Sequence, residues 1–313
     1  MKKSSVFMLL SGIILTVGIV LVVAGALSGA FSLTSSGIRL QDGQIEEFFD
    51  ELSNLHFSLG APDQKVQQTE TYENTFSNIV IDVISADVLL VPSDDNSYHV
   101  ETVYRENEPV TVSQEGDSLQ IKQRQRGGFF LFRWSFGSES QVKLHVPEKA
   151  LCSKLTLSTV SGSVTWKLEG KEEMNLLSLS TVSGDIQGGE MEAQSVSLSS
   201  TSGGISGAVK AETLKLSSTS GDIDLNMQQV RELHANTVSG DIQLAGAIQT
   251  SAELNTVSGD VTLSLPDRPS HYTLHFSSVS GDSTVSGASM ADMESGAVSL
   301  RIGTTSGDLH LQF

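Results

Sequence analysis

The stretch "NTVSGDIQL", residues 236–244, indicates a repeat architecture, because nineteen residues later the chain repeats it as "NTVSGDVTL", residues 255–263. A Ser-Gly step preceded by Thr or Val recurs from there in both directions, at intervals of 22, 19, 18, 19, 19, 22 and 26 residues. Self-similarity at a nearly fixed period is typical of a solenoid, in which each repeat packs only on its neighbours. The motif glycines are Gly162, Gly184, Gly203, Gly221, Gly240, Gly259, Gly281 and Gly307.

Short stretches of alternating polarity flank each motif glycine. Leu214 and Leu216 precede Gly221, and Ile223 and Leu225 follow it. Alternation of period two predicts strands with one inward row of apolar side chains, and the repeats lack helical periodicity. The sequence therefore predicts an all-β fold, a β-solenoid whose coils of about 19 residues stack about 4.8 Å apart.

The motif has a direct structural interpretation as the corner of a coil. Glycine adopts positive φ without strain, so we expect it to turn the chain, with the preceding Ser securing the turn. The Asp that follows is expected to accept hydrogen bonds from backbone N–H groups, and Val238, Ile242 and Leu244 are expected in the core. Ser163 and Gly204 occupy the Asp place in two coils. The predicted turn carboxylates are Asp185, Asp222, Asp241, Asp260, Asp282 and Asp308.

The repeats also carry a family resemblance. "LTLSTVSGSV", "LSLSTVSGDI" and "LKLSSTSGDI", with "IVIDVISADVLLV" and "KLHVP" ahead of them, resemble the DUF4097 family over roughly residues 76–313. That family is described as adhesins with β-strand repeats and includes LiaG-like and YvlB-like envelope proteins of Gram-positive bacteria. The resemblance implies a β-solenoid on the cell surface, beside a membrane-bound signalling system, and it brings no catalytic residues.

The N-terminal segment predicts a membrane anchor. Residues 6–31 carry no charge and follow Lys2 and Lys3. As a helix they would span about 39 Å, more than the hydrocarbon core of about 30 Å. The lysines place the N-terminus in the cytoplasm and the C-terminal domain outside a single-pass protein of the cell membrane. A cleaved signal peptide, for which residues 24–26 supply small side chains, is the alternative.

Four segments follow from these patterns. Residues 1–32 are predicted as cytoplasmic tip and transmembrane anchor, and 33–75 as a juxtamembrane helix and a polar linker. Residues 76–151 are predicted as an irregular β region that leads into the repeats, with Ala86 in a glycine place, and 152–313 as the solenoid.

The densest aromatic stretch, "GGFFLFRWSFG" at residues 127–137, falls within the irregular β region. Either it forms a hairpin that closes one end of the core, or it is an exposed apolar tip that contacts a membrane or a partner. The candidate partner contacts are Phe129, Phe130, Phe132, Trp134 and Phe136.

Charge and cysteine content narrow the function. The formal net charge of -18 repels phosphate backbones, so we expect no nucleic-acid partner. Cys152 is the only cysteine, which excludes an intramolecular disulfide and a thiolate metal cluster and predicts a small core residue.

Catalytic, cofactor and metal sites are not expected. The Asp column lacks the spacing of a calcium-binding β-roll, which leaves turn capping as its predicted role and weak cation binding as the alternative. Lys210, Lys215 and Arg231 are scattered along the sequence. Of the histidines, only His271 and His275 are close in sequence, and they are predicted to lie on one strand face.

The predicted function is therefore that of an adhesin or an envelope binding or scaffold module, linked to envelope-stress sensing, which binds an envelope protein or a glycan. The alternative is a secreted polysaccharide-active β-helix enzyme. Because the C-terminal "GDLHLQF" reads as a final strand, we also expect an open edge at Phe313 that is covered by self-association or a partner.

Overall fold

The computed structural model describes residues 65–106, 108–124, 140–148, 150, 152–168, 174–286 and 289–313. The predicted membrane anchor, the juxtamembrane helix and the aromatic stretch 127–137 lie outside the described residues. Within the described ranges, there is no helix with the length and hydrophobicity needed to span a bilayer.

The described residues fold into β-strands joined by tight turns and two short 3-10 helices. The strands belong to one 19-stranded sheet, which confirms the predicted all-β class. In chain order the elements are β1 (Lys65–Tyr72), β2 (Asn78–Asp82), β3 (Asp87–Pro92), β4 (Tyr98–Arg105), β5 (Val110–Glu115), β6 (Ser118–Gln123), β7 (Gln141–Val146), β8 (Lys154–Thr159), β9 (Val164–Trp166), β10 (Leu176–Thr181), β11 (Ile186–Ser200), β12 (Ile205–Ser218), β13 (Ile223–Asn236), β14 (Ile242–Thr256), β15 (Val261–Ser264), η1 (Pro269–His271), β16 (Tyr272–Ser278), β17 (Ser283–Ser286), η2 (Met290–Met293), β18 (Val298–Thr304) and β19 (Leu309–Gln312).

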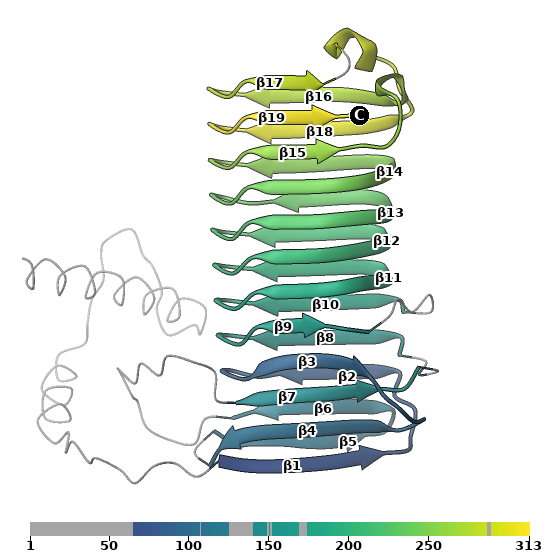
Figure 1. The fold of residues 1–313 in the computed structure, drawn as a ribbon, viewed down its shortest axis with the longest axis vertical. Helices are drawn as coiled ribbons and strands as arrows, with labels where there is room; N and C mark the ends of the chain where they lie inside the picture. Colours follow the sequence, from purple (N-terminus) through teal and green to yellow (C-terminus); the bar gives the residue numbers. More distant parts are fainter. Residues whose placement is uncertain are drawn as a thin grey trace, which may run out of the picture. The chain divides into compact units, whose positions relative to one another are not determined.

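Successive coils stack through parallel strands, as Figure 1 shows. Leu177 of β10 lies in register between Leu155 of β8 and Val196 of β11. The long strands β11 to β14 each run from one corner, bend, and return along the other face to the next corner. Their bends coincide with shifts in strand register, for example between Gln187 and Glu190 in the β11–β12 pair. The described chain is thus a flattened β-solenoid.

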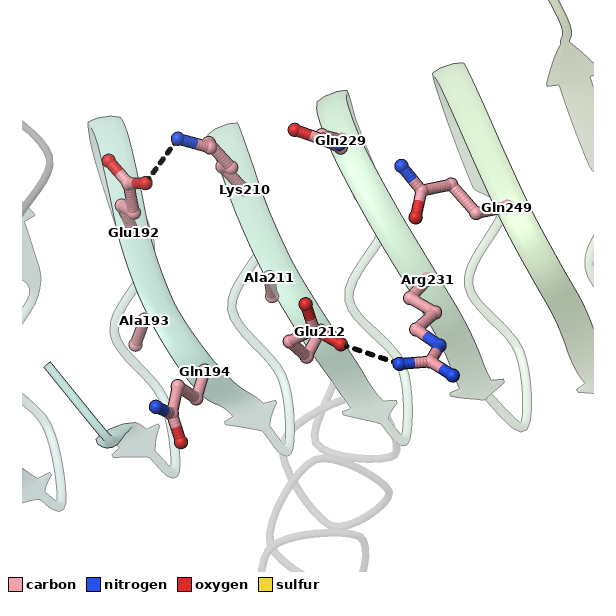
Figure 2. A pocket seen from close by; sticks show the side chains of 9 residues that line it. All are labelled: Glu192, Ala193, Gln194, Lys210, Ala211, Glu212, Gln229, Arg231 and Gln249. Carbon is pink, nitrogen blue, oxygen red and sulfur yellow. Dashed lines mark hydrogen bonds and ion pairs between the residues drawn. The ribbon is translucent and has the colours of Figure 1, made fainter. Parts of the chain in front are cut away.

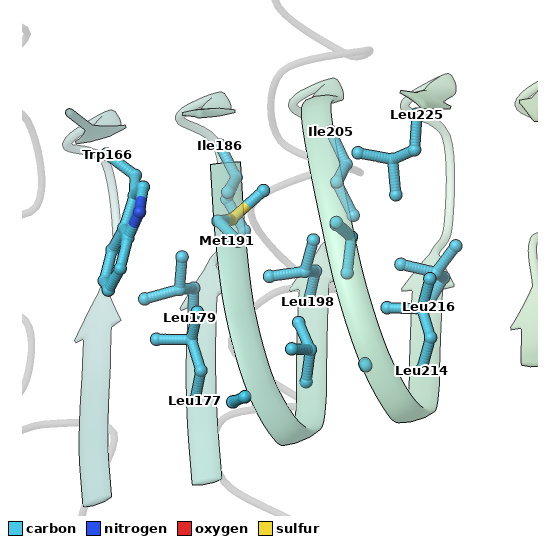
Figure 3. Packing of buried hydrophobic residues seen from close by; sticks show 14 of the residues in the cluster. Trp166, Leu177, Leu179, Ile186, Met191, Leu198, Ile205, Leu214, Leu216 and Leu225 are labelled. Carbon is cyan, nitrogen blue, oxygen red and sulfur yellow. The ribbon is translucent and has the colours of Figure 1, made fainter. Parts of the chain in front are cut away.

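The core lies between the two faces, where the inward rows of consecutive coils meet (Figure 3). Leu179 and Leu198 are fully buried on one face, and Ile186 and Ile205 are at most 1% exposed on the other. Burial of each such side chain contributes about 1.5–3 kcal/mol. Cys152 is buried in the same core, as its predicted role required.

The N-terminal end is more regular than predicted. β2 pairs in parallel with β6 and β8, and β3 with β7 and β9, so the region expected to be irregular continues the stack. β4 then pairs antiparallel with β7, and β5 with β6.

Strand β1 (Lys65–Tyr72) falls within the segment predicted as a linker, and that part of the prediction is wrong. All eight residues of β1 pair antiparallel with β4. Val66 and Tyr72 pack partly buried against the core, whereas the polar side chains between them misled the sequence interpretation. Backbone pairing holds this strand along its whole length, and its two apolar side chains add contacts with the core.

The C-terminal end departs from chain order. β18 pairs with β14 on one side and β16 on the other, and β19 likewise lies between β15 and β17. The last coil is therefore inserted one level below the coil that precedes it in the sequence (Figure 1). The prediction that the strand ending at Phe313 is an open edge is wrong, because the longer connection through η2 lets the chain return into the stack.

Candidate functional site

The motif glycines form one column at the corner of the coils, and their role is close stacking. A Cβ on Gly240 would lie 2.1 Å from the carbonyl oxygen of Gly221, and one on Gly259 would lie 2.0 Å from that of Gly240. Among the described residues, positive φ occurs only at Gly116, Gly207 and Gly246. The predicted reason, a turn through positive φ, is therefore wrong at the motif positions, where the chain needs the absence of a side chain.

A hydroxyl three residues before each motif glycine closes the corner, and it is buried in every coil except that of Gly281, where Ser278 is only partly buried. The N–H of Gly240 donates to Thr237 Oγ1 at 3.1 Å, and that of Gly203 donates to Ser200 Oγ at 2.9 Å. Sequence reasoning assigned the turn to Ser239, whose own N–H instead donates to the carbonyl of Thr219 in the preceding coil. The sequence signal for this role is the Thr or Ser that stands three residues before every motif glycine. The buried hydroxyls are Thr159, Thr181, Ser200, Ser218, Thr237, Thr256 and Thr304.

The substitution Thr237→Val tests this hydroxyl. It preserves the shape of the side chain but leaves the buried N–H of Gly240 without an acceptor. We expect the free energy of unfolding to fall by about 1–3 kcal/mol, measured by chemical denaturation. Thr237→Ser, which keeps the hydroxyl as Ser200 and Ser218 do, should retain most of the stability; equal losses in both variants would contradict this role.

The Asp column joins successive coils, except between Gly204 and Asp222, where glycine offers no side-chain acceptor. Asp222 Oδ1 accepts from the N–H of Asp241 at 2.9 Å, and Asp241 Oδ1 accepts from that of Asp260 at 2.8 Å. Ser163 Oγ stands in as the acceptor for the N–H of Asp185 at 3.3 Å. The same arrangement serves Asp185, Asp260 and Asp308 as acceptors. No group of three or more metal-ligating side chains occurs in the part of the chain that the structure describes.

An exposed row of β-branched side chains lies beside this corner. Val238 is 46% exposed, so its predicted place in the core is wrong, whereas Ile242 and Leu244 are fully buried. All the exposed large apolar residues of the described chain occupy this one position of the coil. They are Ile84, Val160, Val182, Val238, Val257 and Val279.

A polar groove lies at the other edge of the coils, where β11 to β14 bend between the faces (Figure 2). Its volume is about 190 Å³. The nearly buried Ala193 and Ala211 line it with small side chains, so charged and amide groups supply its functional atoms. The groove residues are Glu192, Ala193, Gln194, Lys210, Ala211, Glu212, Gln229, Arg231 and Gln249.

Two ion pairs cross from coil to coil in this groove. Lys210 Nζ lies 2.5 Å from Glu192 Oε1, and Arg231 Nη1 donates to Glu212 Oε2 at 3.2 Å. Lys210 and Arg231, which are far apart in the sequence, thus each form an ion pair with a glutamate of the preceding coil. Lys215 does not line the groove and lies in register with His234. The signal that could have found the pairs is opposite charge one coil apart, at separations of 18 and 19 residues.

The two histidines predicted to share a strand face do not do so. His271 lies in η1 and stacks edge-on against Tyr272. His275 lies in β16, in register with Arg301 of β18.

A different pair of histidines meets at the N-terminal end. The rings of His99 and His145 are 5.9 Å apart between centroids. His99 Nε2 lies 3.0 Å from Asp95 Oδ1, and His145 Nε2 lies 2.8 Å from Glu101 Oε1. Burial opposes ionisation of Glu101, but the hydrogen bond with His145 and the charge of Lys143 outweigh it, so the pKa of Glu101 is lowered. The cluster ties β4 to β7 and lies away from the groove residues.

The family model described as Toastrack DUF4097 matches residues 76–312, and no protein among the curated ones matches the chain. A solved "putative adhesin" from Bacteroides fragilis is 11% identical, with 80% of this chain and 100% of that chain covered and a TM-score of 0.49. A "putative adhesin" from Parabacteroides merdae is 15% identical, with 79% and 96% covered and a TM-score of 0.44. A "putative lipid binding protein" from Parabacteroides distasonis is 17% identical, with 78% and 96% covered and a TM-score of 0.40.

Proposed function

The chain belongs to the Toastrack DUF4097 family, and we propose that it is a membrane-anchored, extracytoplasmic adhesin or scaffold that binds an envelope glycan and catalyses no reaction. The uncharged residues 6–31, preceded by two lysines, support the anchor and its orientation. A role beside a membrane-bound signalling system is part of the same proposal and rests on the family resemblance.

The observation that carries glycan binding is the composition of the groove. Amide side chains of Gln194, Gln229 and Gln249 stand beside the two ion pairs. Amide, guanidinium and carboxylate groups together offer donors and acceptors in fixed directions, which suits the hydroxyl groups of a sugar. A volume of about 190 Å³ fits a short segment of a chain that continues along the edge, rather than a fully enclosed ligand.

The ion pairs favour binding over the alternative, a polysaccharide-active enzyme. Glycoside hydrolysis requires two carboxyl groups that flank the scissile bond as acid and base or nucleophile. In the groove, Glu192 and Glu212 each face a cation from the next coil. Such pairs hold side chains in position for recognition, and they leave no free acid–base pair in the groove.

The substitution Arg231→Ala tests the groove. It removes the donor that faces Glu212 and one wall of the groove, so we expect affinity for purified peptidoglycan or soluble envelope polysaccharide to fall about tenfold. Binding is measured by co-sedimentation and by titration of the full-length chain.

Arg301→Ala is the matched control, because Arg301 is an exposed arginine on β18 that does not line the groove. It should bind as the unchanged protein does. Equal binding by Arg231→Ala, or an equal loss in both variants, would overturn glycan recognition by this groove.

A further inference from the structure

The groove at the bend of β11 to β14 has an apolar floor, which consists of Ala193 and Ala211. These two residues belong to one inward row of the core, in which Ala193, Ala211, Val230 and Ile248 lie in register on successive coils. Val230 and Ile248 are at most 1% exposed, and their larger side chains fill the row in β13 and β14. The groove therefore lies where the row carries only methyl groups.

Polar side chains border this floor on both sides (Figure 2). Glu192, Lys210 and Gln229 lie in register on one side, and Glu212 and Arg231 lie on the other. Each glutamate forms an ion pair with a cation of the next coil, so the charged groups that line the groove sum to zero. Although the chain has a net charge of -18, the groove itself is electrostatically complementary to an uncharged group.

The uncharged polar side chains of the groove are all amides, namely Gln194, Gln229 and Gln249. All three residues are exposed, so the amide groups are accessible to a ligand. A glutamine side chain donates through its NH2 group and accepts through its carbonyl oxygen. It can therefore pair with both the N–H and the C=O of an amide in the ligand.

We propose that the groove recognises the acetamido group of an N-acetylated sugar, an inference that rests on the glycan binding proposed above. The acetamido group is uncharged, its methyl group packs on Ala193 and Ala211, and its N–H and C=O pair with the amide of Gln229. Hydroxyl groups alone would leave the apolar floor without a contact. A free amine, a carboxylate or a phosphate would bring a charge into a groove whose own charges are already paired.

Chemical de-N-acetylation of purified peptidoglycan tests the proposal with the full-length chain. It converts acetamido groups into amines on the same polymer, and re-acetylation restores them. Co-sedimentation is measured in about 0.5 M salt, which screens the attraction between the freed amines and the acidic chain. We expect binding to be about tenfold weaker after de-N-acetylation and to recover after re-acetylation. Equal binding to all three forms would overturn acetamido recognition and leave glycan binding in place, whereas binding to none of them would overturn both.

Ala211→Val tests the floor, because it places the side chain that Val230 has in the next coil where the acetamido methyl group is expected. We expect binding of the acetylated polymer to fall about tenfold and binding of the de-N-acetylated polymer to stay unchanged. Ala208→Val is the matched control, because Ala208 is a partly exposed residue of the same strand that does not line the groove. It should bind both polymers as the unchanged protein does.

Gln229→Leu tests the amide at an exposed position, where the substitution leaves the core unchanged. It should also weaken binding of the acetylated polymer alone, whereas Gln243→Leu, on an exposed part of β14 outside the groove, should not. Undiminished binding by Ala211→Val and Gln229→Leu, or equal losses in their controls, would contradict acetamido recognition. Arg231→Ala reports on the groove separately, since a loss in that variant supports glycan binding whichever group of the sugar is recognised.

Discussion

Gly203→Ala is expected to lower the free energy of unfolding by about 3–5 kcal/mol. A Cβ on Gly203 would lie 1.9 Å from the carbonyl oxygen of Gly184 and 2.4 Å from its carbon. These are backbone atoms, so no side chain can move aside, and the two coils must separate. The separation would weaken the neighbouring hydrogen bond between the two coils, from the N–H of Ser202 to the carbonyl of Val182.

Gly204→Ala provides the control at the next residue of the same corner. A Cβ there meets only Asp222 O at 3.7 Å and Asp185 Oδ1 at 3.8 Å, which are ordinary contacts. We expect a change within about 1 kcal/mol, because alanine also restricts the unfolded chain. Urea denaturation followed by the fluorescence of the buried Trp166 measures both variants, and similar stabilities would contradict the stacking role.

The stacked coils were predictable because the repeat imposes the same local choices many times. Alternating residues such as Leu214 and Leu216 determine which side chains face inward, and the spacing of the motif determines where each coil turns. The sequence did not reveal why the motif needs glycine, because a backbone with positive φ and a close approach between two backbones both favour glycine. Only the position of the Gly221 carbonyl against Gly240 distinguishes the two.

The order of coils at the ends could not be read from the repeat. A coil of this kind presents nearly the same surface to any neighbour, so the local pattern does not specify whether Gly281 or Gly307 stacks on Gly259. In the structure Gly307 does. The choice depends on the connections through η1 and η2, whose lengths determine which return of the chain is sterically feasible.

The groove could not be predicted from the sequence, for a related reason. Its residues lie midway between corners, where the sequence has no motif, and the separation of Glu212 from Arg231 equals one coil only once the coil length is known. Charges that look scattered along the chain become neighbours in the stack. The His99 and His145 cluster is harder still, because antiparallel β4 brings together residues 46 positions apart.

Gln123→Leu is the second substitution expected to have a large effect, at the corner between β2 and β3. In later coils a Thr or Ser three residues before the glycine accepts the corner N–H, but here Ala86 takes the glycine place and Val83 takes the hydroxyl place. Gln123 of β6 supplies the missing acceptor from the coil below. Its Oε1 accepts from the N–H groups of Ile84 at 2.9 Å, Ser85 at 2.9 Å and Ala86 at 3.3 Å.

Leucine at position 123 keeps the bulk but leaves three N–H donors without this acceptor, so we expect a loss of about 2–4 kcal/mol in the free energy of unfolding. Gln120→Leu, on the outward face of the same strand, should cost less than about 1 kcal/mol. The decisive measurement is a double-mutant cycle with Val83→Thr, which restores the hydroxyl found at Thr159. Val83→Thr should recover about 1 kcal/mol in the Gln123→Leu background and none in the unchanged protein. Additive effects would mean that Gln123 stabilises the corner by packing alone, whereas recovery would show that two residues on different strands solve the same hydrogen-bonding requirement.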